Sequence, residues 1–179
     1  RMESTALGAW KMTRTVLSKD RKIVAKVSGA AHITPFSKAK KIFLYEENGT
    51  MAFQNTESSM KVSKSYYLKS NEDAKESLNS IRGLVFPLSV YFTRGDNGEQ
   101  LETCETKNLY VTFAKEEEKD DTTSSSDVIR CPSTVHHCGN DIYSACIELS
   151  KDGSIATECV VKGPKKDYFI VSQYSRDVF

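Results

Sequence analysis

The chain has 179 residues, in which 25 lysine and arginine residues nearly balance 24 aspartate and glutamate residues. With a pI near 7.8, this balance gives no strong electrostatic case for a nucleic acid or an anionic membrane as partner. The longest apolar run, residues 84–92, is too short to span a bilayer. We therefore predict one domain over residues 1–179, with a core of its own.

The expected strands follow from apolar and polar residues alternating with a period of two, while helical periodicity is nearly absent. Two turn signals, Asn48-Gly49 and Lys151-Asp152-Gly153, predict hairpins. Strands are expected at 10–17, 22–27 (continuing past a bend at Gly29 to 33), 41–47, 50–54, 62–69, 84–94, 109–114, 141–149, 155–162 and 168–176, whereas residues 101–106 have a weaker strand pattern.

Two segments depart from this pattern. Residues 71–81 predict the one helix, with Asn71 as its cap. Residues 115–127 are acidic and rich in serine, so we expect a flexible loop. The whole pattern predicts an all-β fold: a closed or nearly closed antiparallel up-and-down barrel of nine or ten strands, with at most one or two short helices. Closure removes exposed strand edges, which favours the barrel over the alternative, a β-sandwich.

Charged and aromatic residues recur at alternate positions of these strands, and so share one face of each strand. The four columns expected to face inward are Trp10, Met12, Arg14 and Val16; Phe43, Tyr45 and Glu47; Asp141, Tyr143, Ala145 and Ile147; and Ile170, Ser172, Tyr174 and Arg176. A buried charge needs a partner. The columns therefore predict an interior network of Arg14, Glu47, Asp141, Tyr143, Tyr174 and Tyr66. The alternative is that some strands run in the other register and keep their charges in solvent.

Five cysteines form an odd set without the paired spacing of structural metal sites: Cys104, Cys131, Cys138, Cys146 and Cys159. A domain of this size needs no disulfide framework, so free thiols in a reducing compartment are the simpler expectation. No signal peptide is visible, and Arg1-Met2 is expected to be a cloning remnant or the cut end of a longer chain. We therefore expect an intracellular location, in the cytoplasm or inside an organelle.

Several motifs resemble those of calycin (lipocalin-like) barrels, in which a final arginine packs across a tryptophan of the first strand. Gly8-Ala9-Trp10 and Arg176 carry this likeness. The chain is also similar to an uncharacterised lipocalin-like domain family with the motifs H-x-C-x-x-D-x-Y, G-P-x-K-D, Y-x-R and L-x-Y-x-E-x-G. These fall on His136, Cys138, Asp141 and Tyr143; on Gly163, Pro164, Lys166 and Asp167; on Tyr174 and Arg176; and approximately on Phe43, Tyr45, Glu47 and Gly49.

One segment departs from that family, because its D-G-R sequence and the following Phe-His are replaced by residues 94–97, Arg-Gly-Asp-Asn. The resemblance therefore implies a barrel and a pocket, without a reaction. The histidines leave further alternatives open. His136 and His137 near Cys131 and Cys138 suggest zinc, although the spacing is unlike structural sites; His137 or His32 is the candidate haem ligand; and a histidine bonded to nearby backbone needs no ligand at all.

The predicted function is binding of a small, partly polar, anionic ligand in the barrel. The predicted site comprises Arg14, Tyr45, Glu47, Tyr66, His136, Asp141, Tyr143, Lys166, Tyr174 and Arg176. One alternative is an isomerase, hydrolase or bilin-lyase-like enzyme with Asp141 and Tyr143 as acid and base, although Asp141 equally fits a turn cap. Another is a non-catalytic module that binds a protein partner in a larger assembly. The sequence identifies neither a cofactor nor a metal site.

Overall fold

The computed structural model describes residues 6–37, 41–70, 80–81, 84–94, 99–101, 104–116 and 127–176. These residues contain no α-helix, only the 3-10 turn η1 (Thr106–Asn108), and no helix among them is long and apolar enough to cross a membrane. The strands are β1 (Gly8–Ser18), β2 (Ile23–Ser37), β3 (Ile42–Phe53), β4 (Ser59–Ser70), β5 (Ser80–Ile81), β6 (Leu84–Val85), β7 (Leu88–Phe92), β8 (Leu109–Phe113), β9 (Val128–Pro132), β10 (His136–Cys138), β11 (Asp141–Ser150), β12 (Ile155–Lys162) and β13 (Asp167–Ser175).

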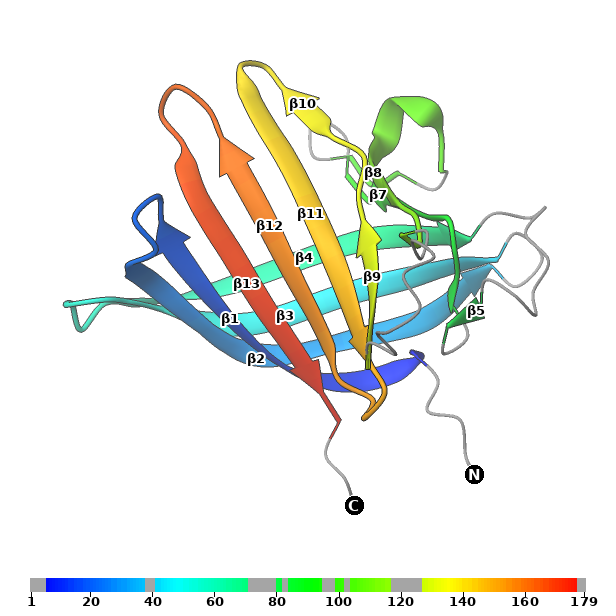
Figure 1. Ribbon diagram of the computed structural model, residues 1–179, viewed down its shortest axis with the longest axis horizontal. Helices are drawn as coiled ribbons and strands as arrows, with labels where there is room; N and C mark the ends of the chain where they lie inside the picture. Colours follow the sequence, from blue (N-terminus) through cyan, green and yellow to red (C-terminus); the bar gives the residue numbers. More distant parts are fainter. Residues whose placement is uncertain are drawn as a thin grey trace, which may run out of the picture.

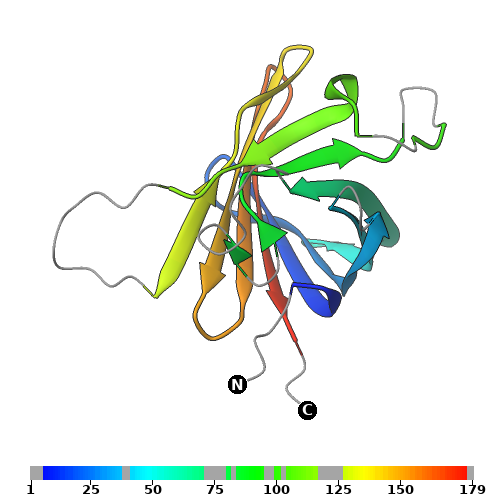
Figure 2. The same ribbon diagram turned by 90° about the vertical axis from the view of Figure 1, so that its right-hand side faces the viewer.

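Eleven of the strands form one antiparallel sheet in the order β10-β11-β12-β13-β1-β2-β3-β4-β7-β8, with β9 also paired to β11, while β5 and β6 form a separate two-stranded sheet. In Figures 1 and 2 the strands β2–β4 cross β11–β13 steeply, and β1, which pairs with both β13 and β2, bends between the two groups so that the sheet curves back on itself. The two edges meet where Ala114 N donates to Pro132 O at 3.1 Å and Thr134 N donates to Thr112 O at 2.8 Å. The predicted nearly closed barrel is therefore confirmed, and the sandwich is excluded.

The predicted hairpin at Asn48-Gly49 is wrong, because both residues lie in the middle of β3. Gly49 pairs with Gly29 of β2, and Asn48 pairs with Ala30. The two strands approach so closely here that a Cβ on Gly29 would lie 2.1 Å from the Asn48 carbonyl oxygen. Glycine is therefore needed here because the two strands lie so close together. The turn comes later in the chain, between β3 and β4.

Other local predictions had mixed outcomes. The hairpin around residues 151–153 is confirmed between β11 and β12. Residues 71–79 of the expected helix and 117–126 of the expected loop lie outside the described residues, but Ser80 and Ile81 form a strand with β6 rather than a helix end. Within 101–106 the described residues form no strand. The strands β9 and β10 were not predicted.

The inward columns put apolar side chains at one end of the barrel, which we call the closed end. Its core cluster comprises Ala6, Ile33, Leu68, Phe86, Leu88, Val90, Val111, Phe113, Cys131 and Leu149. The opposite end, which we call the mouth, carries the β1–β2, β3–β4, β10–β11 and β12–β13 turns (Figure 1). Between the two ends lies the lumen.

Arg176 closes the bottom of the lumen together with Trp10. Its guanidinium carbon lies 4.5 Å from the centre of the Trp10 ring, and its Nη2 donates to the Leu7 carbonyl oxygen. The indole Nε1 of Trp10 donates to Ala6 O at 2.8 Å. The arrangement matches the arginine-over-tryptophan contact that the calycin resemblance implied.

We expect Arg176→Met to lower the free energy of unfolding by about 1–2 kcal/mol, because it removes a cation–π contact and a charged hydrogen bond. Urea denaturation followed by circular dichroism measures the loss. Arg130→Met is the control, since Arg130 and its partner Glu148 are both exposed and such pairs contribute little. Equal stability of the Arg176 variant and the wild type would show that the closed end does not depend on this arginine.

Candidate functional site

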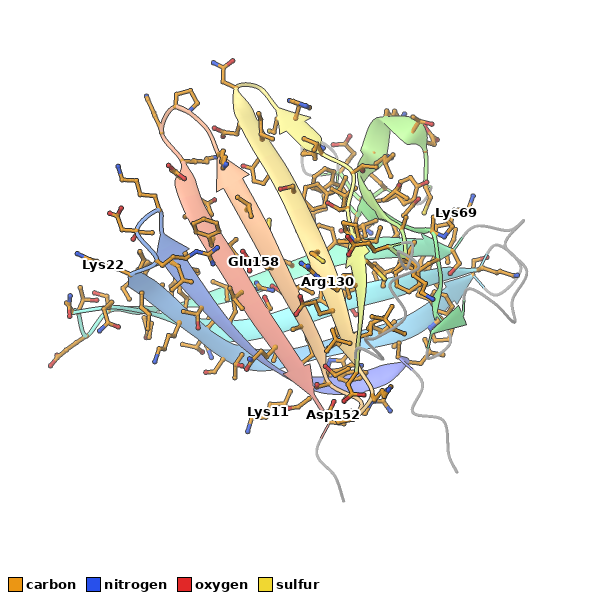
Figure 3. The ribbon with its side chains drawn as sticks, in the orientation of Figure 1. Lys11, Lys22, Lys69, Arg130, Asp152 and Glu158 are labelled. Atoms are coloured by element: carbon orange, nitrogen blue, oxygen red, sulfur yellow. The ribbon has the colours of Figure 1, made fainter. Side chains whose placement is uncertain are left out.

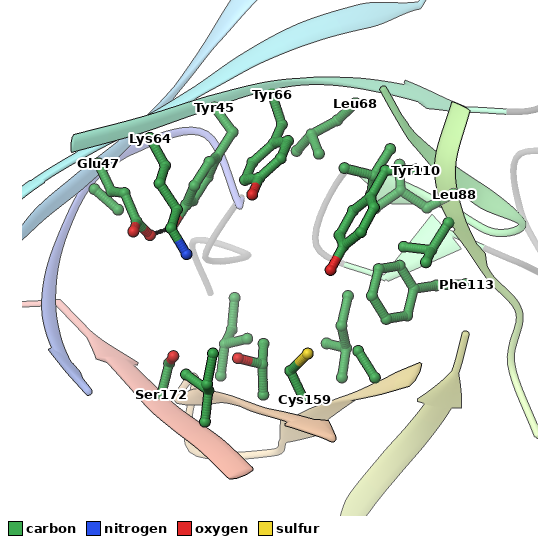
Figure 4. A pocket seen from close by; sticks show the side chains of 18 of the residues that line it. Tyr45, Glu47, Lys64, Tyr66, Leu68, Leu88, Tyr110, Phe113, Cys159 and Ser172 are labelled. Atoms are coloured by element: carbon green, nitrogen blue, oxygen red, sulfur yellow. Dashed lines mark hydrogen bonds between the residues drawn. The ribbon is translucent and has the colours of Figure 1, made fainter. Parts of the chain in front are cut away.

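A cavity of about 510 Å³ occupies the lumen (Figure 4), a volume typical of small-molecule sites. Aliphatic and phenylalanine side chains cover its deep part and much of its wall. Six tyrosines also line it, namely Tyr45, Tyr66, Tyr110, Tyr143, Tyr168 and Tyr174. Its remaining polar and charged lining consists of Arg14, Glu47, Lys64, His136, Cys138, Thr157, Cys159 and Ser172. Such a surface suits a molecule with a large apolar body and few polar groups.

A bidentate ion pair between Arg14 of β1 and Glu47 of β3 crosses part of the lumen. Arg14 Nη1 donates to Glu47 Oε1 at 2.6 Å, and Nη2 donates to Oε2 at 2.7 Å. The third donor of the guanidinium, Nε, binds Ser172 Oγ at 2.8 Å. Their side chains are 10% and 3% exposed, so the pair is desolvated yet satisfied. The structure thus joins two of the charges that the sequence placed in the interior network.

Two tyrosines extend this network across the lumen. The Tyr45 hydroxyl donates to Glu47 Oε2 at 2.5 Å and lies 3.1 Å from the Tyr174 hydroxyl. Although burial acts to raise the pKa of Glu47, its bonds with Arg14 and the Arg14 charge hold that pKa below its ordinary value. Burial raises the pKa of Tyr45 well above that of a free tyrosine, so its hydroxyl stays protonated.

Lys64 of β4 stands opposite Glu47 in the strand register and extends into the lumen (Figure 4). Within the described residues it makes neither a hydrogen bond nor an ion pair, because Glu47 is already engaged by Arg14 and Tyr45. Lys64 is an exposed residue, so water reaches its side chain through the open lumen. It nevertheless lines the cavity, where protein atoms lie around it on several sides. Burial first, and the nearby Arg14 charge second, lower the pKa of the Lys64 ammonium.

An aromatic belt, defined as Tyr45, Tyr66, Phe92, Tyr110, His136 and Tyr143, runs around one side of the lumen. Tyr66 stacks with Tyr45 at 6.2 Å and with Tyr110 at 5.9 Å between ring centroids. His136 meets Tyr110 edge-on at 4.9 Å and lies 6.0 Å from Tyr143. Burial raises the pKa of Tyr66 to about 12, and it also raises that of Tyr110. The belt therefore offers ring faces and protonated hydroxyls to a ligand.

Asp141 and Lys166 form a separate cluster at the mouth. Lys166 Nζ lies 2.7 Å from Asp141 Oδ2 and donates to the Tyr143 hydroxyl at 3.0 Å. These contacts raise the pKa of the Lys166 ammonium, the bond to Asp141 contributing most. Gly163 allows this closeness, since a Cβ there would lie 1.9 Å from Asp141 Oδ1. The carboxylate is thus held by an ammonium at the rim.

The structure divides the predicted network into these two clusters, with the aromatic belt between them. Tyr66, His136, Tyr143 and Tyr174 line the cavity as predicted, whereas Asp141 and Lys166 lie beyond its lining and Arg176 packs beneath it. Sequence reasoning missed Lys64, Tyr110 and Cys159. The signal for Lys64 was present, because it shares a strand face with Tyr66, two residues later. Tyr110 and Val111 are successive and both line the cavity, beside a register shift between β7 and β8 that no alternation rule predicts.

The histidine alternatives find little support among the described residues, in which no three His, Cys, Asp or Glu side chains are grouped to hold a metal ion. His32 and His137 are exposed and do not line the cavity. His136 is the one histidine that reaches the lumen, where it packs against aromatic rings.

The comparison with one solved structure agrees with the fold. The S-type phycobiliprotein lyase CPES from Guillardia theta aligns with 97% of this chain and 89% of its own, with a TM-score of 0.54 and 10% identity. A protein with a YmcC-like fold from Bacteroides fragilis aligns over 96% of both chains, with a TM-score of 0.31 and 9% identity. A search of curated proteins finds no match.

The sequence comparison with protein families is more direct. Residues 7–176 match the family of unknown function DUF6314. Together with the barrel fold, this match fits the expected likeness to an uncharacterised lipocalin-like family. Since it spans nearly all of the chain, the protein belongs to the DUF6314 family.

Proposed function

We propose that this barrel binds a small, partly polar, anionic molecule in its lumen. The observation that carries the proposal is the charge of the cavity wall. Apart from His136, the charged groups of the described lining are Arg14, Glu47 and Lys64. Arg14 and Glu47 neutralise each other, which leaves Lys64 with an unmatched positive charge in a largely apolar space. An acidic group on the ligand supplies the missing partner.

The remaining lining favours a flat, mainly apolar body for this ligand. The rings of the aromatic belt provide stacking surfaces, and the hydroxyls of Tyr66 and Tyr110 point into the lumen (Figure 4). We propose Arg14, Tyr45, Glu47 and Tyr174 as the network that fixes the wall beside the acid group. Asp141 and Lys166 shape the entrance, and Arg176 supports the floor.

Native mass spectrometry of freshly purified protein tests the proposal. We expect an additional mass that is lost on collisional activation and that is acidic when the released molecule is analysed. A thermal-shift screen of aromatic and aliphatic acids against their neutral amides is the complementary measurement. Equal stabilisation by the amides and the acids, or no stabilisation by either, would contradict an anionic ligand.

An enzyme on the same barrel is the second candidate, favoured by the fold likeness to a phycobiliprotein lyase. Asp141 and Tyr143 would then act as acid and base at the mouth, where both contact Lys166. Turnover that disappears in Asp141→Asn, while ligand binding persists, would favour this role over simple binding. Cys131, Cys138, Cys146 and Cys159 form no disulfide, which supports the proposed location in a reducing compartment inside the cell.

A further inference from the structure

Exposed large apolar side chains gather at the mouth of the barrel. Among the described residues seven such side chains are exposed: Ile23, Val24, Phe36, Phe53, Met60, Val135 and Ile142. Five of them lie next to the mouth turns, and Met60 is 51% exposed. Scattered exposed apolar residues need no explanation, but a concentration at one end of a molecule marks a contact site.

Four of these residues, Ile23, Val24, Phe53 and Met60, lie at the strand ends beside two adjoining turns. We call the two segments, residues 18–24 around the β1–β2 turn and residues 53–61 around the β3–β4 turn, the tip. A hydrogen bond of 2.8 Å from Gln54 N to Val24 O joins them. By strand register, Phe53 and Met60 share the inner face with Glu47, whereas Val24 alternates with the inward Ala25 and faces outward. The tip therefore exposes apolar side chains on both faces, Phe53 and Met60 on the inner face and Val24 on the outer face.

Basic residues lie within the tip and in the neighbouring segments of the mouth. The four mouth segments 18–24, 53–61, 137–143 and 162–168 contain seven lysine and arginine residues against four aspartate and glutamate residues, an excess of three, whereas the whole chain has an excess of one. Lys19, Lys22, Lys61 and Lys165 are exposed. Figure 3 shows Lys22 on the tip and Lys11 toward the opposite end of the barrel. The balanced total charge thus conceals a basic mouth.

We propose that the mouth of the barrel docks on an anionic lipid surface, with the tip inserted among the headgroups. Lysine side chains around an apolar edge match a negatively charged leaflet, since the ammonium groups pair with lipid phosphates while the apolar groups enter the acyl boundary. A protein partner covers one face of a strand pair, but lipid surrounds an inserted edge on both faces. The two-sided tip therefore favours lipid over protein.

This orientation places the opening of the lumen against the membrane. A ligand with an apolar body and an acidic group, such as the one proposed above, would then pass between bilayer and lumen with little exposure to water. The docking itself does not depend on that ligand, because the tip and the lysines lie outside the cavity lining.

Vesicle co-sedimentation tests the docking, with vesicles of phosphatidylcholine alone and of phosphatidylcholine mixed with phosphatidylserine. We expect the wild type to bind the mixed vesicles at least about tenfold better than the neutral ones, and to detach at high salt. The double variants Ile23→Ser/Phe53→Ser and Lys19→Glu/Lys22→Glu should each lose about tenfold in binding to the mixed vesicles.

Matched changes away from the mouth serve as controls. Phe36→Ser removes an aromatic ring that is more exposed than Phe53 and lies near the other end of β2, and Lys11→Glu reverses an exposed charge on β1. Both should bind as the wild type does, and circular dichroism checks that every variant is folded. The proposal is overturned if the wild type ignores the mixed vesicles, or if tip and control variants bind equally.

Discussion

Replacing Glu47 with alanine is expected to destabilise the protein by about 3 kcal/mol or more, because it leaves the Arg14 guanidinium in the lumen without its carboxylate. Both side chains are nearly inaccessible, at 10% and 3%. The Tyr45 hydroxyl loses its acceptor in the same variant. Urea denaturation monitored by circular dichroism measures the change. We expect this to be the largest loss from any single polar substitution in the barrel.

Two further variants separate the ion pair from general effects on β3. Glu46→Ala changes the neighbouring exposed carboxylate on the outer face and should leave stability unaltered. Arg14→Met combined with Glu47→Leu removes both charges and should recover most of the loss. If the double variant is no more stable than Glu47→Ala, the unpaired charge is not the cause.

The Arg14–Glu47 ion pair also predicts that the stability of the fold depends on pH. Because the folded state lowers the pKa of Glu47, its stabilising contribution is complete above the unfolded pKa near 4.5 and is lost as the pH falls through the lower, folded value. Glu47→Gln should therefore lose less stability than the wild type over that acidic range.

Replacing Lys64 with methionine is expected to weaken binding of an anionic lumen probe at least about tenfold, since the variant keeps the apolar stem and removes the unmatched charge. A suitable probe pair is 8-anilinonaphthalene-1-sulfonate and its uncharged analogue N-phenyl-1-naphthylamine, which differ only in the sulfonate. Fluorescence titration measures both affinities. The neutral probe should bind the variant about as well as the wild type.

Lys61→Met is the matched control, because Lys61 is an exposed lysine on the opposite face of the same strand. Since the free ammonium of Lys64 has a lowered pKa and a bound anion raises it, affinity for the sulfonate should be complete below the free pKa. The affinity for the sulfonate should then fall as the pH rises through the higher pKa that Lys64 has in the complex. Equal losses for both probes would assign Lys64 a role in shape rather than charge.

The fold could be predicted because alternation along long strands is a local property of the sequence. Trp10, Arg14, Tyr45 and Glu47 were expected on inner faces for this reason, and the structure places them there. The turn at Asn48-Gly49 failed because a contact with Gly29, far away in sequence, outweighed a local preference.

Predicting the site was harder, since it depends on which charges meet. The sequence indicated that a buried Arg14 needs an acidic partner. It could not show that both Glu47 oxygens would bind Arg14, so that Lys64 has no carboxylate partner. Asp141 was expected in the same network, yet Lys166 holds it at the rim. The short strand β10 was missed because three residues are too few to show a period.

The position of Trp10 has a practical consequence. It is the sole tryptophan of the chain, it is 3% exposed, and it faces the cavity from below the tyrosines of the belt. Because tyrosine emission overlaps indole absorption, tyrosines of the belt that are excited transfer energy to Trp10. A ligand in the lumen that absorbs at the wavelengths of tyrosine or tryptophan emission would quench the Trp10 signal, so the protein's own fluorescence can report occupancy without a label.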